Sequence, residues 1–206
     1  MWNTQAKLQG KSDIPLNEKG VALARLTGEA LSDVHFEAVY SSPLKRALQT
    51  AQLVAKETDA PVVVDRRLEE IGFGIWEGLS CHRDHYEIPS ESFQAFFTDP
   101  FHYEPPKDGE RIQEVCDRTA DFLEELLKEK RDQDINVLIS SHGCTLRALM
   151  NYFYQDHTEN FWRGHVPPNC GVCIVDVDKE GFRILEEDRI YYDKGNMGDY
   201  YGEGRQ

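Results

Sequence analysis

The stretch VLISSHGCTLRALM, residues 137–150, joins a strand pattern directly to a helix pattern. The apolar run Ile135–Ser140 is typical of a buried strand, and a helix is expected from about Thr145 to Phe153. His142 follows the strand, and Gly143 allows a close turn into the helix. In open α/β sheets, ligands bind beyond the carboxyl ends of the strands, where the next helix start favours an anion. A phosphate-binding histidine and a structural histidine fit this position about equally well.

The same alternation extends in both directions from this stretch. Expected helices are an Asn17-capped helix to about Leu31, a helix with Ser42 as N-cap and Pro43 as its first residue, and Glu110–Lys130. Further expected strands are Phe36–Tyr40, a buried Pro61–Asp65, and a closing pair at Gly171–Asp178 and Phe182–Glu186. Strands separated by helices predict a three-layer α/β/α sandwich with a mostly parallel sheet.

The chain of 206 residues, 40% of them apolar, suits one globular domain over residues 1–206. Neither an internal repeat nor a linker marks a second domain. Periodicity fades over about 72–108, where we expect an irregular cap insertion. The polar, Gly-rich tail from about 194 is expected to be loose.

The formal net charge of −14 argues against nucleic acid or an anionic membrane as a partner. No apolar run long enough to span a membrane and no secretory signal stand out. Five cysteines without a regular framework favour a reduced, cytoplasmic protein. An anionic substrate would need a local cationic pocket, so the basic residues must be considered position by position.

Two further stretches place charged side chains near strand ends. In YSSPLKRALQTA, residues 40–51, Arg46 lies early in a helix, where a guanidinium could grip an anion bidentately. In RRLEEIGFGIWEGLS, residues 66–80, Glu69 or Glu70 could serve as a general acid. Taken singly, each stretch is explained as well by solvated surface charge.

Together, the ordered motifs QGxxDxPLxxxG, SSPLxRAxxTA, LxEixFGxWEG and SHGxxLRAL resemble the histidine phosphatase superfamily, the phosphoglycerate mutase-like phosphatases and mutases. The resemblance runs from Met1 to about Asp176. It implies a phosphohistidine mechanism without a metal or other cofactor. By motif, Arg46 would clamp the phosphate, Glu70 (with Glu69 competing) would protonate the leaving oxygen, and His142 would stabilise the transferring group. Substrate-binding positions implied by the same motifs are Asn3, Gln9, Gly10, Gly143 and the amide of Cys144.

One part of the family pattern is not in the printed sequence. An R-H-G motif supplies the nucleophilic histidine in this family, and three residues later comes a Trp-Asn pair, here Trp2-Asn3. The R-H-G motif would fall just before Met1, with the first central strand ahead of it. We therefore expect a sheet that lacks this strand, with two neighbours unpaired, and a chain that is inactive as printed. A start assigned at an internal methionine, a real truncation and a pseudoenzyme are three explanations.

The expected function is hydrolysis of a small phosphorylated metabolite. The short insertion after the Glu motif favours a phosphatase over a mutase, and a catalytically dead phosphate-ligand-binding protein is the alternative from another class. The aromatic residues between Phe93 and Tyr103 would either cover an organic phosphate or form the core of the cap. Cys170 and Cys173 have CxxC spacing without a second pair, so no metal site is expected. A homodimer is a candidate assembly.

Overall fold

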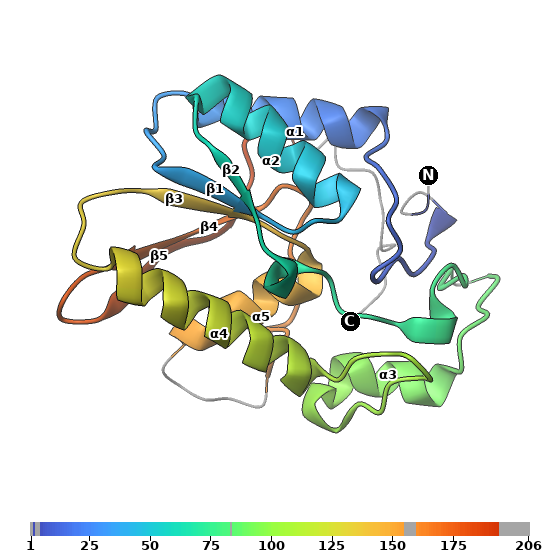
Figure 1. Ribbon diagram of the computed structural model, residues 1–206. Helices are drawn as coiled ribbons and strands as arrows, with labels where there is room; N and C mark the ends of the chain where they lie inside the picture. Colours follow the sequence, from blue (N-terminus) through green and yellow to red (C-terminus); the bar gives the residue numbers. More distant parts are fainter. Residues whose placement is uncertain (1, 3–4, 83, 155–159, 194–206) are drawn as a thin grey trace.

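The computed structural model describes residues 2, 5–82, 84–154 and 160–193. At its centre lies a parallel sheet in the order β2–β1–β3, made of β1 (Ala38–Ser41), β2 (Val62–Val64) and β3 (Val137–Ser140). The three strands point the same way, so their carboxyl ends share one edge of the sheet (Figure 1). This edge is where the sequence predicted a ligand.

Helices cover both faces of this sheet, as predicted. Helices α1 (Glu18–Ala30) and α2 (Lys45–Thr58) lie on one face (Figure 1). Helices α4 (Ile112–Lys130) and α5 (Gly143–Phe153) lie on the other. The three-layer α/β architecture is therefore confirmed.

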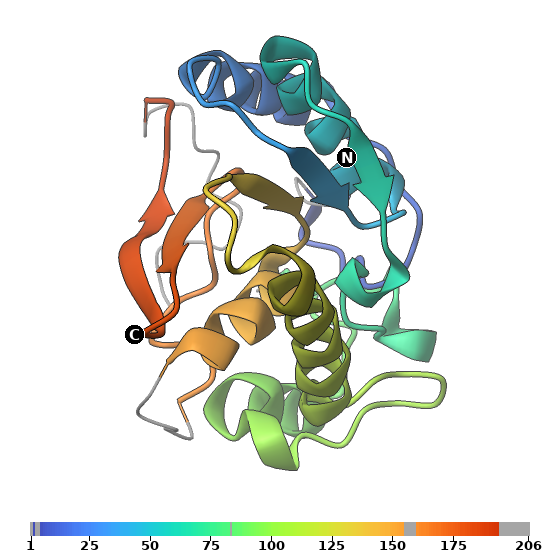
Figure 2. The same ribbon diagram turned by 60° about the vertical axis from the view of Figure 1, so that its left-hand side comes forward.

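A second, antiparallel sheet consists only of β4 (Val172–Val177) and β5 (Phe182–Arg189). Among the described residues, β3 pairs with β1 alone and β4 with β5 alone. The strands thus form two separate sheets (Figure 2). Strand β3 is an edge strand of the parallel sheet, and β4 belongs to the antiparallel one.

Two local predictions were wrong. Helix α2 begins at Lys45, not at Pro43, because the buried Ser42 hydroxyl accepts from Leu44 N–H at 3.2 Å and the chain is still extended at Leu44. Strand β2 was predicted to be buried, but it forms the outer edge of the sheet, where Val64 is 51% exposed. A run of valines indicates a strand without indicating which side of the sheet it borders.

The cap is more regular than the sequence suggested. Residues 72–108 contain α3 (Ser90–Thr98) and two 3₁₀ turns, η3 (Gly74–Trp76) and η4 (Pro100–His102). Another 3₁₀ turn, η2 (Arg66–Leu68), lies just before the cap. The rings of Phe93, Phe96 and Tyr103 are at most 4% exposed, so the aromatic set forms mainly the core of the cap. The predicted loose tail and Asn3 lie outside the described residues.

Candidate active site

Arg46, Glu70 and His142 meet at the carboxyl edge of the parallel sheet, although 96 residues separate Arg46 from His142 in the chain. Arg46 is the second residue of α2, which follows β1, and His142 is the N-cap of α5, which follows β3. Glu70 follows η2, which comes after β2. Each parallel strand thus leads to one member of the group.

The Arg46 guanidinium is held by three hydrogen bonds from the protein. Its Nε donates to His142 Nδ1 at 3.1 Å, Nη1 to the Ser12 carbonyl at 2.8 Å, and Nη2 to the Gly10 carbonyl at 2.7 Å. Since a guanidinium has five N–H groups, one remains on each Nη for a ligand. Burial lowers the pKa of Arg46, and the Glu70 carboxylate opposes that change. An oriented, always-charged fork of this kind suits a phosphate group.

The contacts of His142 determine its tautomer. Because Arg46 Nε can only donate, His142 Nδ1 must be the acceptor and carries no proton. In the neutral ring the proton is therefore on Nε2, which lies 2.8 Å from the Ser42 hydroxyl. Burial, followed by Arg46 and Arg118, lowers the pKa of His142 well below its usual range.

Burial and two nearby guanidinium groups favour the neutral ring. A phosphate dianion beside the ring would act in the opposite direction, because a nearby negative charge favours the imidazolium.

Glu70 occupies the start of α5. Its Oε1 accepts from Ile71 N–H at 2.9 Å and Thr145 N–H at 3.2 Å, and its Oε2 accepts from Cys144 N–H at 3.3 Å. The Cys144 amide was expected to face the substrate, but here it binds this carboxylate. Glu69 contributes its backbone carbonyl, which accepts from the Thr145 hydroxyl at 2.6 Å. The structure therefore brings Glu70 to the site through its carboxylate, whereas Glu69 contacts Thr145 through its backbone carbonyl.

Residues 9–12 form a rim beside Arg46. Gly10 adopts a left-handed backbone conformation with φ +51°, and a Cβ there would lie 2.2 Å from Glu77 Oε1. Gln9 accepts from Ser12 N–H through its carbonyl at 3.0 Å. At Gly143, the first residue of α5, an added Cβ would make only ordinary van der Waals contacts, at 3.5 Å from Val166 and 4.0 Å from Glu70.

Glu77, which the sequence analysis did not select, holds this rim in place. Its Oε1 accepts from the amides of Lys11 at 2.8 Å and Phe73 at 3.1 Å, and its Oε2 accepts from the Ser12 hydroxyl at 2.6 Å. The WEG part of the third motif contains Glu77, but a glutamate after a turn gives no sign of a partner 65 residues away.

Arg118 was also missed. It extends from α4 to Glu110, with Nε at 2.8 Å from Oε1, and its Nη1 donates to the Arg67 carbonyl at 2.5 Å. Lys11 Nζ lies 3.4 Å from the same glutamate. Burial by itself raises the pKa of Glu110. The hydrogen bonds and charge of Arg118, together with Lys11 and the Gly72 N–H, outweigh burial, so the pKa of Glu110 is lowered. The only sequence signal was a pair of opposite charges eight residues apart at the start of a strong helix.

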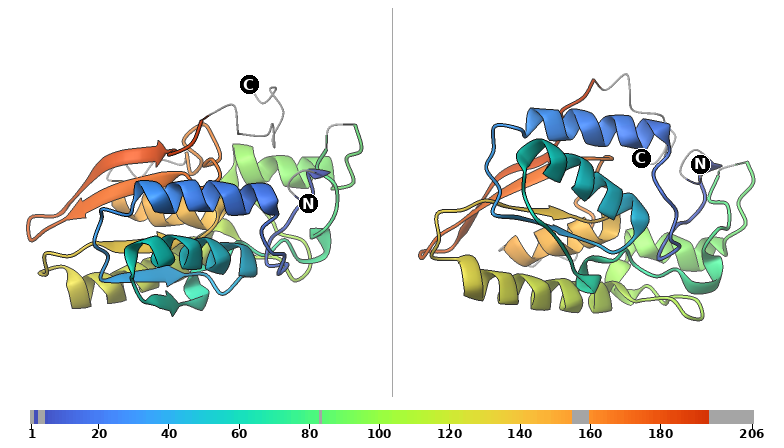
Figure 3. Two further views of the ribbon diagram at one scale, coloured as in Figure 1. Left: turned by 90° about the horizontal axis from the view of Figure 1, so that it is seen from above. Right: turned by 45° about the horizontal axis from the view of Figure 1, so that its top comes forward.

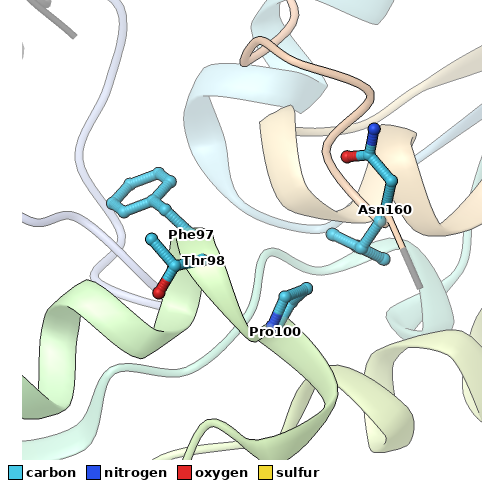
Figure 4. A pocket seen from close by; sticks show the side chains of 5 residues that line it. Phe97, Thr98, Pro100 and Asn160 are labelled. Carbon is cyan, nitrogen blue, oxygen red and sulfur yellow. The ribbon is translucent and has the colours of Figure 1, made fainter. Parts of the chain in front are cut away.

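Other candidate features lie elsewhere. A cavity of about 270 Å³ in the cap is lined by Phe97, Thr98, Pro100, Asn160 and Phe161, not by the residues around Arg46 (Figure 4). In the part of the chain that the structure describes, no three histidine, cysteine or acidic residues gather as metal ligands. Cys173 Sγ lies 3.7 Å from Asp188 Oδ1. No described helix is long and apolar enough to cross a membrane.

Comparisons with known proteins agree with this geometry. The chain matches the histidine phosphatase superfamily (branch 1) over residues 1–188, and it belongs to that family. It is 35% identical over 153 residues to the metal-independent phosphoserine phosphatase of Arabidopsis thaliana, covering 72% of this chain and 62% of the plant protein. It is 31% identical over 153 residues to 2,3-bisphosphoglycerate-dependent phosphoglycerate mutase 2 of Gloeobacter violaceus, covering 73% and 69% of the two chains. The solved structure of Bacillus stearothermophilus YhfR superposes with a TM-score of 0.80 at 32% identity, covering 92% of each chain.

Proposed function

We propose that this chain provides the phosphate-binding site of a metal-independent phosphatase. The enzyme would hydrolyse small phosphate monoesters through a phosphohistidine intermediate. The observation that carries the proposal is the convergence of Arg46, Glu70 and His142 at the sheet edge. The two free N–H groups of Arg46 bind two phosphate oxygens, and His142 donates from Nε2 to a third after leaving Ser42.

In the proposed reaction, a histidine nitrogen attacks phosphorus and the bond from phosphorus to the ester oxygen breaks. Glu70 gives a proton to the departing alcohol oxygen. Water then attacks the phosphohistidine, Glu70 takes a proton back, and inorganic phosphate leaves. The nucleophile is the histidine of an R-H-G segment ahead of Trp2-Asn3, as the family resemblance implies.

The test compares three proteins on p-nitrophenyl phosphate. They are the printed chain, the chain joined to a strand that ends in R-H-G with the family spacing, and the joined chain carrying His142→Ala. We expect turnover by the joined chain and a loss of about 100-fold or more in the variant. No turnover by the joined chain would contradict the proposal. Turnover by the printed chain itself would assign the chemistry to another nucleophile.

A mutase is the second candidate, because one relative at 31% identity is named as a bisphosphate-dependent mutase. Release of inorganic phosphate from a monophosphate without any bisphosphate supports the phosphatase. Interconversion of monophosphates that requires a bisphosphate supports the mutase. Tight binding of phosphate esters without turnover by the joined chain indicates a catalytically dead binding protein.

Two coarser expectations belong to the same proposal. No two of the described cysteines are joined by a disulfide, which supports a reducing, cytoplasmic setting. A homodimer is retained as the candidate assembly, and sedimentation equilibrium would test it.

A further inference from the structure

The outer strand of the parallel sheet, β2, contains no charged residue. It consists of Val62, Val63 and Val64, and among the described residues it pairs with β1 alone. In the view from above, β2 lies on the side of the molecule opposite to the β4–β5 hairpin (Figure 3). Proteins often protect a sheet edge with charged side chains or with a covering segment. Val63 and Val64 are instead 43% and 51% exposed, so apolar surface remains uncovered at this edge.

The backbone groups of Val62 and Val64 point away from the sheet. The Asp65 N–H donates to the Ser41 carbonyl at 2.9 Å, so Asp65 and, two residues earlier, Val63 direct their backbone groups toward β1. By alternation along the strand, Val62 and Val64 direct theirs outward. An extended segment placed beside β2 could therefore form hydrogen bonds with both residues.

A groove of about 140 Å³ lies between this edge and helix α4. Its floor is apolar and includes Tyr40, Val63, Phe122 and Leu126. The ring centres of Tyr40 and Phe122 are 5.6 Å apart, in an edge-to-face arrangement. Alternate side chains of a segment paired with β2 would point to the α4 side of the sheet, so an apolar one could cover this floor.

Carboxylates surround the apolar floor. Asp65, Glu125 and Glu129 line the groove, and Asp121 lies one helical turn before Glu125 on α4. Arg67 also lines the groove and donates to Asp65, Asp121 and Glu125 at 2.6–2.7 Å. Four carboxylates and one guanidinium give this group of side chains a net charge of −3. The groove therefore favours a cationic ligand.

The position of Arg67 shows which chemical group the groove accepts. Its guanidinium lies 5.4 Å from the centre of the Phe122 ring, over the apolar floor. Glu129 lies one turn beyond Glu125 on the same helix. Within the described part of the chain, the Glu129 carboxylate has no partner of this kind. The neighbouring cations Arg66 and Lys128 do not line the groove.

We infer that the β2 edge and this groove bind an extended segment of a partner protein, in which lysine or arginine residues alternate around an apolar residue. The apolar side chain covers Val63, and a basic side chain two positions away reaches Glu129. Because β2 has only three residues, its hydrogen bonds alone would bind weakly, and the apolar floor and the carboxylates supply the rest.

A second copy of this chain is a poorer occupant. It would bring the same group of carboxylates close to its own counterpart, and each chain carries a net charge of −14. Arg46, Glu70 and His142 do not line the groove, so this inference does not depend on the proposed function.

The test adds the peptide Thr-Lys-Thr-Val-Thr-Lys-Thr to the full chain and measures amide hydrogen exchange residue by residue. When extended, this peptide presents its valine between two lysines on one face. We expect exchange at Val62 and Val64 to slow by about tenfold or more at saturating peptide. A peptide with glutamate in place of both lysines should leave these rates unchanged. Unchanged rates with the lysine peptide, or equal protection by both peptides, would overturn the inference.

Glu129→Lys and Glu124→Lys form a matched pair for the protein side. Both residues are exposed on α4 and both changes alter the net charge equally, but only Glu129 lines the groove. The Kd of the lysine peptide, measured by calorimetry, should rise about tenfold or more in Glu129→Lys and stay within about twofold in Glu124→Lys. Equal weakening in both variants would mean that net charge, and not the groove, attracts the peptide, and this result would overturn the inference.

Val64→Pro tests the backbone part of the contact. It removes an N–H that points only outward, and proline is tolerated at the edge of a sheet. Protection of Val62 by the lysine peptide should be lost in this variant. Retained protection would contradict pairing along β2.

Hydrogen exchange without peptide separates a partner segment from a second copy. We expect the rates at Val62 and Val64 to be independent of protein concentration. Slower exchange at higher concentration, together with a dimer in sedimentation equilibrium, would assign this edge to a second copy and overturn the inference.

Discussion

At the scale of single residues, the pocket is built from side chains that orient one another before any ligand arrives. Arg46 fixes the tautomer of His142, and the rim carbonyls of Gly10 and Ser12 fix the plane of Arg46. The rim in turn depends on Glu77. Through this series of contacts, the position of the Arg46 guanidinium depends on the Glu77 carboxylate, which contacts no ligand itself.

Glu77→Ala should therefore release the rim. Two backbone N–H groups and the Ser12 hydroxyl would lose their acceptor, and we expect a loss of about 2 kcal/mol in the free energy of unfolding. Urea unfolding measures this loss. In the chain joined to a strand that ends in R-H-G, kcat/KM should fall as well, because Arg46 loses its fixed orientation.

Glu77→Gln is the matched control. Its amide oxygen can still accept from both backbone N–H groups, and its NH₂ can donate to the Ser12 hydroxyl. We expect a loss of less than about 1 kcal/mol. If the two variants were equally destabilised, negative charge rather than hydrogen-bond acceptance would hold the rim.

At the scale of elements, α4 is joined to the site by a charged pair rather than by apolar packing alone. The side chains of Arg118 and Glu110 are 17% and 13% exposed, so the pair is largely withdrawn from water. Arg118→Met should cost about 3 kcal/mol, because it leaves a largely buried carboxylate without its main partner. Thermal or urea unfolding would measure this cost.

A double-mutant cycle identifies the cause. Arg118→Met combined with Glu110→Gln removes the uncompensated charge, so the double variant should be more stable than Arg118→Met alone. Additive losses would show that the two side chains act independently.

An element was predicted correctly where its limits depend on residues close together in the sequence, and wrongly where they depend on residues far apart. Asn17 caps α1 as predicted, by accepting from Gly20 N–H at 2.8 Å, because a cap involves only neighbours in sequence. The start of α2 was wrong by two residues because the Ser42 hydroxyl accepts from Leu44 N–H while the chain is still extended at Leu44, and that hydroxyl also contacts His142, 100 residues away. Helix α3 was missed because its pattern lies between turns rich in proline and glycine.

The candidate site shows the same division. Arg46, Glu70 and His142 could be selected because each stands at a strand-to-helix junction within a recognisable motif. Glu77 and Arg118 act through partners brought near by the fold, and no local pattern marks them. The neutral state of His142 likewise depends on burial and on Arg118 of a distant helix, neither of which is visible in the sequence.

At the scale of the whole molecule, the Arg46 guanidinium is a cationic site within a strongly acidic protein. With a net charge of −14, the surface as a whole repels anions, and binding a phosphate ester depends on Arg46 and its neighbours. Long-range repulsion is screened by salt over about 10 Å at 0.1 M, whereas the buried fork is screened less. The same burial that strengthens the fork also keeps His142 neutral, and this links the site to the stability of the fold.

That linkage gives a pH prediction with a definite sign. The pKa of His142 is near 6.5 when unfolded and well below that when folded. Between these two values the unfolded chain holds a proton that the folded chain lacks, so the free energy of unfolding rises with pH there. Stability is fully present above pH 6.5 and is lost on acidification below it, by at most about 1.4 kcal/mol per pH unit from this group.

Urea unfolding of the wild-type chain and of His142→Asn between pH 4.5 and 7.5 tests this prediction. Asp13, Asp65 and Glu110 also have lowered pKa values, but their ordinary values of 3.8, 3.8 and 4.5 place most of their effect below this range. The wild-type free energy should fall more steeply on acidification than that of the variant, by up to one proton in slope. Parallel curves from pH 6.5 down to 4.5 would mean that His142 takes up a proton as readily in the folded chain as in the unfolded one.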